Sequence, residues 1–263
     1  MIEVKSNREI DLMHRAGVVV AETLYVLCKI IEVGITTGEL ATVAADVIKN
    51  YGAESAFLNY KSDELSQGFP GVVCISINEE VVHGIPGKRK IVDGDVVSFD
   101  VGVRLNGYCA DGAGTIIVGD VTKDVHRLVD VAQQCLYRGI EQATLGNRIV
   151  DISRAVQLTA ESVGFGVIRE LVGHGIGREV HEEPQVPNFC MNGFSLMMPQ
   201  GLTIAIEPMI TLGDRRVNEK DDGWTIVTAD SSLAAHFEHT IVVTENGPKI
   251  LTLRENGKEG WKV

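Results

Sequence analysis

The stretch Val96–Val118, VVSFDVGVRLNGYCADGAGTIIV, decides the fold, because it has the pattern of a β-hairpin that carries acidic residues among apolar ones. Asn106-Gly107 lies between two alternating runs, and this dipeptide is the strongest short-range signal for a two-residue type I′ turn. A turn at that position sets Gly102 opposite Asp111. The local sequence therefore predicts both the hairpin and its register.

Asp100 and Asp111 then share one face of the hairpin, a diagonal step apart, with Cα atoms about 7–8 Å from each other. Two carboxylates at that spacing, flanked by Val97, Phe99 and Val101, repel each other and lose hydration unless they are protonated or bound to cations. A metal site is one interpretation. The other is two hydrated aspartates on an exposed face, and the hairpin alone does not decide between them.

The composition is that of a globular protein. The chain has 263 residues, 44% of them hydrophobic, so it can bury a large core as one large domain or two small ones. Its net charge of −12 argues against a nucleic-acid partner and against binding to a membrane surface, because there is no basic excess to pair with phosphates.

The cellular compartment is predicted from two kinds of segment that the sequence lacks, a transmembrane span and a signal peptide. No apolar run reaches the length of a transmembrane span, and residues 1–17 are too charged for a signal peptide, so we expect a cytoplasmic protein. The five cysteines are scattered without CxxC spacing. This spacing disfavours disulfides and a structural zinc site, and we expect the cysteines to be small buried residues.

Local patterns predict an alternation of helices and strands. Capping boxes at Ser6-x-x-Glu9 and Thr36-x-x-Glu39 begin two helices, the first reaching about Ile31. Apolar periodicity predicts further helices over 121–144 and 149–163, strands over 72–77, 166–172, 202–206 and 237–244, and loops over 83–86, 173–177 and 181–184.

A weak internal repeat relates the two halves of the chain. The pattern Val-His-x-x-Pro occurs at 82–86 and at 180–184, and a Gly-initiated apolar strand that ends in a carboxylate occurs at 94–100 and at 201–207. We therefore predict one α+β domain over 1–263, with pseudo-symmetric halves of about 1–120 and 121–263 and a site at their seam. The alternative is chance similarity between short patterns.

Five polar residues stand in or at the end of an apolar strand, or in a glycine-framed loop: Asp100, Asp111, His174, Glu207 and Glu238. Such an oxygen-rich set suits divalent ions such as Mn, Fe, Co or Zn. Four buried carboxylates need roughly four positive charges, so two ions fit better than one. A water shared by two ions loses a proton near neutral pH and becomes a nucleophile, which indicates hydrolysis.

The motifs HGIPG, VSFDVG, GYCADGAGT, LVGHGIGREVHEEP, IAIEPM and FEHTIVVT, in this order, resemble the type I methionine aminopeptidases of the pita-bread fold. The similarity covers nearly the whole chain. It implies two pseudo-two-fold halves with antiparallel sheet covered by helices. It also implies a hydrolase that removes the initiator methionine from new polypeptides, with two divalent ions per chain (Co, Mn, Fe, Zn or Ni) as cofactors.

The resemblance also assigns roles to the cluster. It implies that Asp100 is a bidentate ligand of one ion, that His174 and Glu207 bind the other, and that Asp111 and Glu238 bridge the two. Glu207 would in addition help to move the proton of the bridging water.

Two histidines and four pocket residues follow from the same resemblance. It implies that His181 contacts the scissile carbonyl and that His83 interacts with the amide nitrogen, and imidazoles there suit a developing oxyanion and a departing amine. The alternative is that both only hydrogen-bond nearby backbone. Four residues match positions that line the methionine pocket of similar enzymes, although ordinary core packing is the alternative for each: Tyr60, Phe69, Cys74 and Trp224.

Several features leave alternatives open. Residues 62–67 resemble an insertion, and Val180 stands where an aromatic residue often precedes the catalytic histidine, so the shape of the pocket does not follow from the resemblance. Aminopeptidase P and prolidase share the five ligands, so cleavage before proline is the nearest alternative activity. A non-catalytic relative that binds peptides or ribosomes is another. The implied partners are nascent polypeptide N-termini and the ribosome near its exit tunnel, and we expect a monomer.

Overall fold

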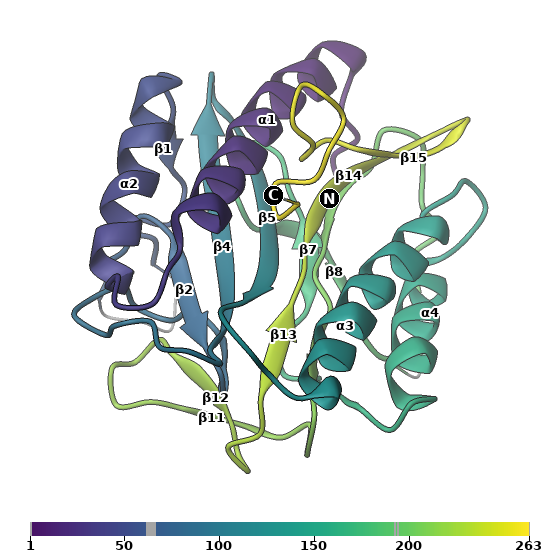
Figure 1. The fold of residues 1–263 in the computed structure, drawn as a ribbon. Coiled ribbons are helices and arrows are strands. Elements are labelled where there is room, and N and C mark those ends of the chain that lie inside the picture. Colours follow the sequence, from purple (N-terminus) through teal and green to yellow (C-terminus); the bar gives the residue numbers. More distant parts are fainter. Residues whose placement is uncertain (1, 62–66, 192, 194, 263) are drawn as a thin grey trace.

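The computed structural model describes residues 2–61, 67–191, 193 and 195–262. Helices occur in two pairs: α1 (Asn7–Ile30) with α2 (Thr37–Asn50), and α3 (Lys123–Glu141) with α4 (Ile149–Glu161). None of the helices described is both long and apolar enough to cross a lipid bilayer. Figure 1 shows α1 lying over β4 and β5 with α2 beside it, while α3 and α4 lie next to each other near the C-terminal strands.

Two larger sheets and two small ones make up the strand layers, and every pairing among them is antiparallel. The first sheet has the order β1 (Glu54–Ser55), β4 (Val96–Leu105), β2 (Cys74–Ile77), with β5 (Tyr108–Ile117) paired to β4. The second has the order β15 (Gly247–Ile250), β14 (His239–Thr244), β9 (Thr203–Ile206), β7 (Gly173–Gly175), β8 (Glu182–Val186). The small sheets are β13 (Ala234–His236), β10 (Met209–Thr211), β6 (Gly166–Val167) and β11 (Val217–Glu219), β12 (Ile226–Thr228), β3 (Glu80–Val82).

The first two helices begin as the sequence predicts. In α1 the Glu9 carboxylate accepts the backbone N–H of Ser6 at 2.8 Å, and in α2 Glu39 accepts that of Thr36 at 2.8 Å, so both capping boxes are formed. These bonds satisfy backbone donors that a helix start leaves without partners. The apolar face of α1 is buried against the hairpin of β4 and β5, so the helix covers one face of this sheet.

The hairpin itself confirms the predicted turn and register. Asn106 and Gly107 have φ angles of 53° and 79°, as a type I′ turn requires, and Gly102 is the partner of Asp111. Asp100 and Asp111 are only 9% and 3% exposed. The alternative of hydrated aspartates on an open face is therefore excluded, and the carboxylates are buried.

Hydrogen bonds between β5 and the start of β14 join the two larger sheets. The N–H of Glu238 donates to the carbonyl of Ala113 at 2.9 Å, and the N–H of Ala113 donates to the carbonyl of Glu238 at 3.3 Å. Thr240 Oγ1 accepts the N–H of Asp111 at 2.9 Å and donates to the Asp111 carbonyl at 2.8 Å. These contacts bring Glu238 next to Asp111, although the two lie far apart in the chain.

Four predicted elements were wrong in extent. The predicted strand 237–244 begins only at His239, because the backbone of Glu238 pairs with Ala113 of the other sheet. The predicted strand 166–172 is a strand only over Gly166–Val167. The predicted loop 173–177 contains β7, and the predicted loop 181–184 contains the start of β8, which pairs with β7. Cys190 is exposed, unlike the other four cysteines. The division into pseudo-symmetric halves stays a prediction.

Thr240→Val tests the link between the sheets. The substitution keeps the shape of a fully buried side chain but leaves the buried N–H and carbonyl of Asp111 without this partner, so we expect a loss of about 1–3 kcal/mol in the free energy of unfolding. Urea unfolding of the metal-free protein measures it. Thr42→Val, on the exposed side of α2, is the matched control, and equal effects of the two variants would contradict the structural importance of the link.

Candidate metal centre and substrate cavity

All eleven residues that the sequence predicts for the site line one cavity of about 320 Å³: Tyr60, Phe69, Cys74, His83, Asp100, Asp111, His174, His181, Glu207, Trp224 and Glu238. They come from both larger sheets and from the loops around them. The cavity is acidic where the two sheets meet and mainly apolar elsewhere, so it has two chemically distinct parts.

The acidic part is built on strands. Asp100 and Asp111 lie within β4 and β5, and His174 is the middle residue of β7. Glu207 directly follows β9, and Glu238 directly precedes β14. Because paired strands hold their residues rigidly, these five side chains have a fixed relative placement.

One imidazole faces the carboxylates with its Nε2 atom. His174 Nδ1 lies 2.8 Å from the carbonyl oxygen of Gly175, which can only accept, so Nδ1 carries the hydrogen and Nε2 keeps its lone pair. Nε2 is 3.6 Å from Glu207 Oε1. One ligand atom each of Asp111, His174 and Glu238 lie within 4.8 Å of one another. This tautomer is the one that binds a cation at Nε2.

The carboxylates destabilise one another in the absence of cations. Burial raises the pKa of Asp111 to about 7. Burial, reinforced by the negative charge of Asp111, also raises the pKa of Asp100, Glu207 and Glu238 well above the usual range. Burial has the opposite effect on the imidazole and lowers the pKa of His174 to about 3, so it is neutral at physiological pH.

Two buried oxygen atoms of the cluster have no hydrogen-bond partner among the described residues: Asp100 Oδ1 and Glu238 Oε1. Buried polar atoms without partners are rare in proteins, since each costs free energy. Oxygen atoms of this kind beside a neutral imidazole are a donor set for hard or borderline divalent cations. The residues present therefore fit such a cation.

Two further histidines stand at the cavity. His181 Nδ1 is 2.7 Å from the hydroxyl of Tyr60, and its ring packs at 4.4 Å against that of His174. His83 adopts a φ of 59°, a left-handed conformation that is uncommon for a residue other than glycine. Its ring lies 6.3 Å from that of Trp224.

The sequence matches metallopeptidase family M24 over residues 11–245. The chain belongs to this family. A methionine aminopeptidase of Clostridium acetobutylicum is 44% identical over 97% of this chain and 100% of its own, and methionine aminopeptidase 1 of Bacillus subtilis is 44% identical over 96% and 99%. The solved structure of a Thermotoga maritima methionine aminopeptidase has 45% identity and a TM-score of 0.92 over 97% of this chain and 100% of that one.

More distant members share the architecture alone. A Pyrococcus furiosus prolidase has a TM-score of 0.77 at 23% identity, over 96% of this chain and 66% of that one. The predicted α+β pita-bread fold and the resemblance to methionine aminopeptidases are confirmed by these comparisons. This M24 chain is thus a metallopeptidase, which agrees with the donor set described above.

Sequence reasoning missed part of the apolar wall of this M24 cavity: Phe57, Val82, Leu171, Val172 and Ile226. Each lies within three residues of a residue that was predicted, so proximity along the chain was the available signal. Phe69 and Trp224 meet edge to face at 5.2 Å on this wall. Val180 is buried in the same apolar cluster, and the proposed insertion at 62–67 lies outside the described residues except for its last position.

One buried histidine stands beside the acidic cluster. Nε2 of His236 lies 3.9 Å from oxygen atoms of both Glu207 and Glu238, and neither of its ring nitrogens has a hydrogen-bond partner among the described residues. His236 precedes Glu238 by two residues in the chain.

We expect the metal-free protein to lose stability as the pH rises from about 7 to about 8. Folded Asp100, Glu207 and Glu238 retain protons that unfolded carboxyl groups, with pKa values of about 4, have released. The folded state then binds more protons, so its free energy of unfolding falls by about 1.4 kcal/mol per pH unit for each retained proton.

Urea unfolding in a chelator at the two pH values measures this slope. Histidines with a lowered pKa act with the opposite sign, but their contribution is complete above the unfolded pKa of about 6.5. Asp100→Asn removes one of the groups that retain a proton, at nearly constant shape, and should make the slope shallower. The same slope in both proteins would contradict mutual destabilisation of the carboxylates.

Proposed function

We propose that this chain removes the N-terminal methionine from peptides and newly made proteins by cation-dependent hydrolysis. One observation carries the proposal: a buried carboxylate and imidazole cluster opens into an apolar cavity of about 320 Å³. It is supported by 44% identity, over 97% of the chain, to a methionine aminopeptidase. We propose nascent polypeptide N-termini as partners, ribosomes as the place of encounter, and a cytoplasmic monomer.

Five residues would hold the cations: Asp100, Asp111, His174, Glu207 and Glu238. We propose two divalent ions, because four carboxylates and a neutral imidazole carry up to four negative charges. Cobalt, manganese, iron, zinc and nickel all suit this donor set. When bound, such ions act as Lewis acids that polarise a carbonyl and lower the pKa of water to near neutrality.

The remaining chemistry belongs to the side chains. Burial and the charge of Asp111 raise the pKa of Glu207, so its carboxyl group is suited to accept a proton and hold it away from solvent. His181 would donate a hydrogen bond to the oxygen of the scissile carbonyl, where negative charge develops. His83 would interact with the nitrogen of the departing amide.

Tyr60 would fix the donor atom of His181. If the Tyr60 hydroxyl donates to Nδ1 across their 2.7 Å separation, the ring hydrogen lies on Nε2. Nε2 is then the nitrogen that can donate to a carbonyl oxygen. Tyr60 therefore serves the tautomer of His181 as well as the cavity wall.

The apolar part of the cavity would hold the methionine side chain. Phe69, Trp224 and Cys74 line it, and Cys74 pairs with Asp100 across β2 and β4, so the pocket begins directly beside the acidic cluster. An unbranched thioether fits such a narrow apolar space, and sulfur packs well against aromatic rings. A substrate bound there would place the peptide bond that follows methionine at the carboxylates.

Peptide assays test the function against its two alternatives. We expect hydrolysis of Met-Ala-Ser and not of Xaa-Pro peptides, with manganese or cobalt added after chelation. Preferred cleavage before proline would support a prolidase-like activity, and absence of turnover with every metal would support a non-catalytic binding protein. Glu207→Gln should lower kcat by about 10²–10⁴-fold, because it loses a ligand and the proton acceptor. Glu219→Gln, also at the cavity but outside the cluster, is the control.

Tyr60→Phe should lower kcat about two- to tenfold and change KM little. The ring that lines the cavity remains, but the hydrogen bond to His181 Nδ1 is lost, and one such bond contributes about 0.5–1.5 kcal/mol. Steady-state kinetics on Met-Ala-Ser measure both constants. Tyr51→Phe, an exposed tyrosine at the end of α2, is the matched control. A change confined to KM would contradict the role in orienting His181.

A further inference from the structure

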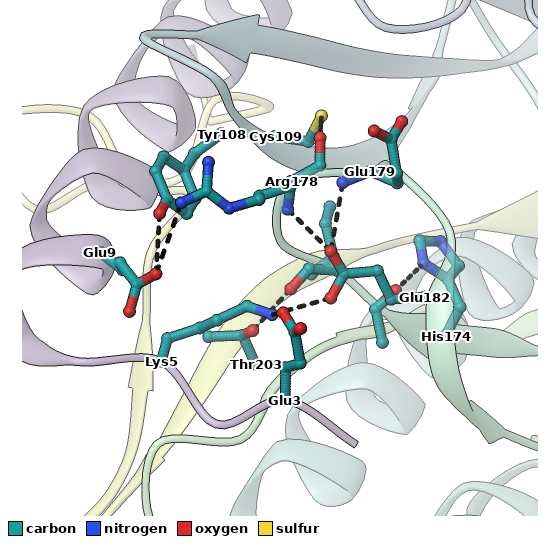
Figure 2. Close-up of polar contacts among 12 residues, drawn as sticks. Glu3, Lys5, Glu9, Tyr108, Cys109, His174, Arg178, Glu179, Glu182 and Thr203 are labelled. Atoms are coloured by element: carbon teal, nitrogen blue, oxygen red, sulfur yellow. Dashed lines mark hydrogen bonds and ion pairs between the residues drawn. The ribbon is translucent and has the colours of Figure 1, made fainter. Parts of the chain in front are cut away.

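A lysine from the start of the chain is buried beside the turn that carries His181. The side chain of Lys5 is 3% exposed, and its Nζ lies 2.8 Å from Glu182 Oε2 and 3.7 Å from Glu3 Oε2 (Figure 2). Its backbone N–H donates to the carbonyl of Gly201 at 2.8 Å. Lys5 thus connects the segment before α1 to the second sheet and to the residue that follows His181.

Glu182 in turn fixes the shape of that turn. Its second oxygen, Oε1, accepts the N–H groups of Arg178 at 2.7 Å and Glu179 at 3.2 Å, so one carboxylate closes the turn 177–182 (Figure 2). The Lys5 ammonium holds the carboxylate from the other side. Glu182 directly follows His181 in the chain, so a single peptide bond joins the anchored residue to the histidine.

The path of Lys5 also explains a glycine in the turn. A Cβ atom at Gly177 would lie 2.4 Å from Lys5 Cε and 2.6 Å from Lys5 Nζ, and both distances are too short for real atoms. A side chain at this position would require the end of the Lys5 side chain to shift. The lysine and the turn are therefore in close contact at this glycine.

A second contact between the N-terminal region and the turn is weaker. The Arg178 guanidinium stacks 4.8 Å over the ring of Tyr108 and lies 4.0 Å from Glu9 Oε1, and the Tyr108 hydroxyl donates to the same Glu9 oxygen at 2.8 Å (Figure 2). The Arg178 side chain is 62% exposed, and exposed pairs contribute little. The pair of buried Lys5 and partly buried Glu182 is the less exposed of these two contacts with the N-terminal region. From β5 and β4, the N–H of Cys109 donates to the Gly177 carbonyl at 2.7 Å and Arg104 donates to the Glu179 carboxylate at 2.8 Å, so the turn is held from two sides.

Stability alone does not account for a largely buried pair of this kind. Desolvation of an ammonium and a carboxylate roughly offsets their attraction, so replacement by apolar residues is often neutral. What the pair adds is a single defined geometry. We propose that Lys5 is a positioning residue for His181: through Glu182 it holds the turn 177–182 so that the imidazole stands against Tyr60 and His174 at the cavity. This inference rests on the proposed function, in which His181 contacts the substrate.

A double-mutant cycle tests the proposal in the manganese-loaded enzyme. Lys5→Met keeps the length of the side chain and removes the charge. We expect it to lower kcat on Met-Ala-Ser about ten- to hundredfold, since small misplacement of a catalytic group has effects of this size. KM and the Kd for manganese, measured by calorimetry, should stay unchanged. In the His181→Ala background, Lys5→Met should have no further effect on kcat.

The controls separate positioning from a general structural role. Arg138→Met removes an exposed ion pair on α3 and should leave kcat unchanged. Glu182→Gln retains an oxygen for the turn but loses the charge, and it should behave like Lys5→Met; it replaces Lys5→Met in the cycle if that variant does not fold.

Two results would overturn the proposal: an unchanged kcat in Lys5→Met, or an equal loss with and without His181. A parent-like kcat in His181→Ala would instead contradict the proposed role of His181, and the inference would fail with it. The single His181→Ala variant therefore distinguishes the two failures.

Discussion

The structure depends on the electrostatic cost of placing four carboxylates in one seam between two sheets. Burial raises the pKa of all four, repulsion by Asp111 raises the pKa of the other three further, and the neutral imidazole of His174 offers no positive charge in compensation. Such a cluster is tolerable only if the rest of the fold holds the side chains together against this repulsion, or if cations neutralise them. The unpartnered oxygens of Asp100 and Glu238 show where the fold leaves room for cations.

Hydrogen bonds to backbone groups hold the two sheets together at the seam. Asp111 and Glu238 belong to different sheets, and the hydrogen bonds of Glu238 with Ala113 and of Thr240 with Asp111 fix them next to each other. These are uncharged bonds between buried groups, so they do not weaken when the carboxylates change protonation. The helices α1 and α3 stabilise the same region through apolar contacts.

Short-range signals predicted the parts of the fold that are decided locally. The Asn106-Gly107 turn set the register of the hairpin, and the capping boxes at Ser6 and Thr36 marked the helix starts. The break before His239 was not predictable in this way, because its cause is Ala113 on another sheet. Residues that the family motifs indicated line the cavity together, whereas its additional apolar wall is set by tertiary packing, which no local pattern records.

The two kinds of functional group are held by different means, and the difference follows from where they lie. The carboxylates stand on or next to paired strands, whose hydrogen bonds give them a fixed place. His181 follows a turn at the surface, where backbone is more mobile and a catalytic geometry needs added support. That support is a hydrogen bond from Tyr60 on one side and, on the other, a lysine 177 positions before Glu182. A contact between residues so far apart in the chain leaves no signal in the local sequence pattern. Through it, the segment before α1 helps to position His181 at the site.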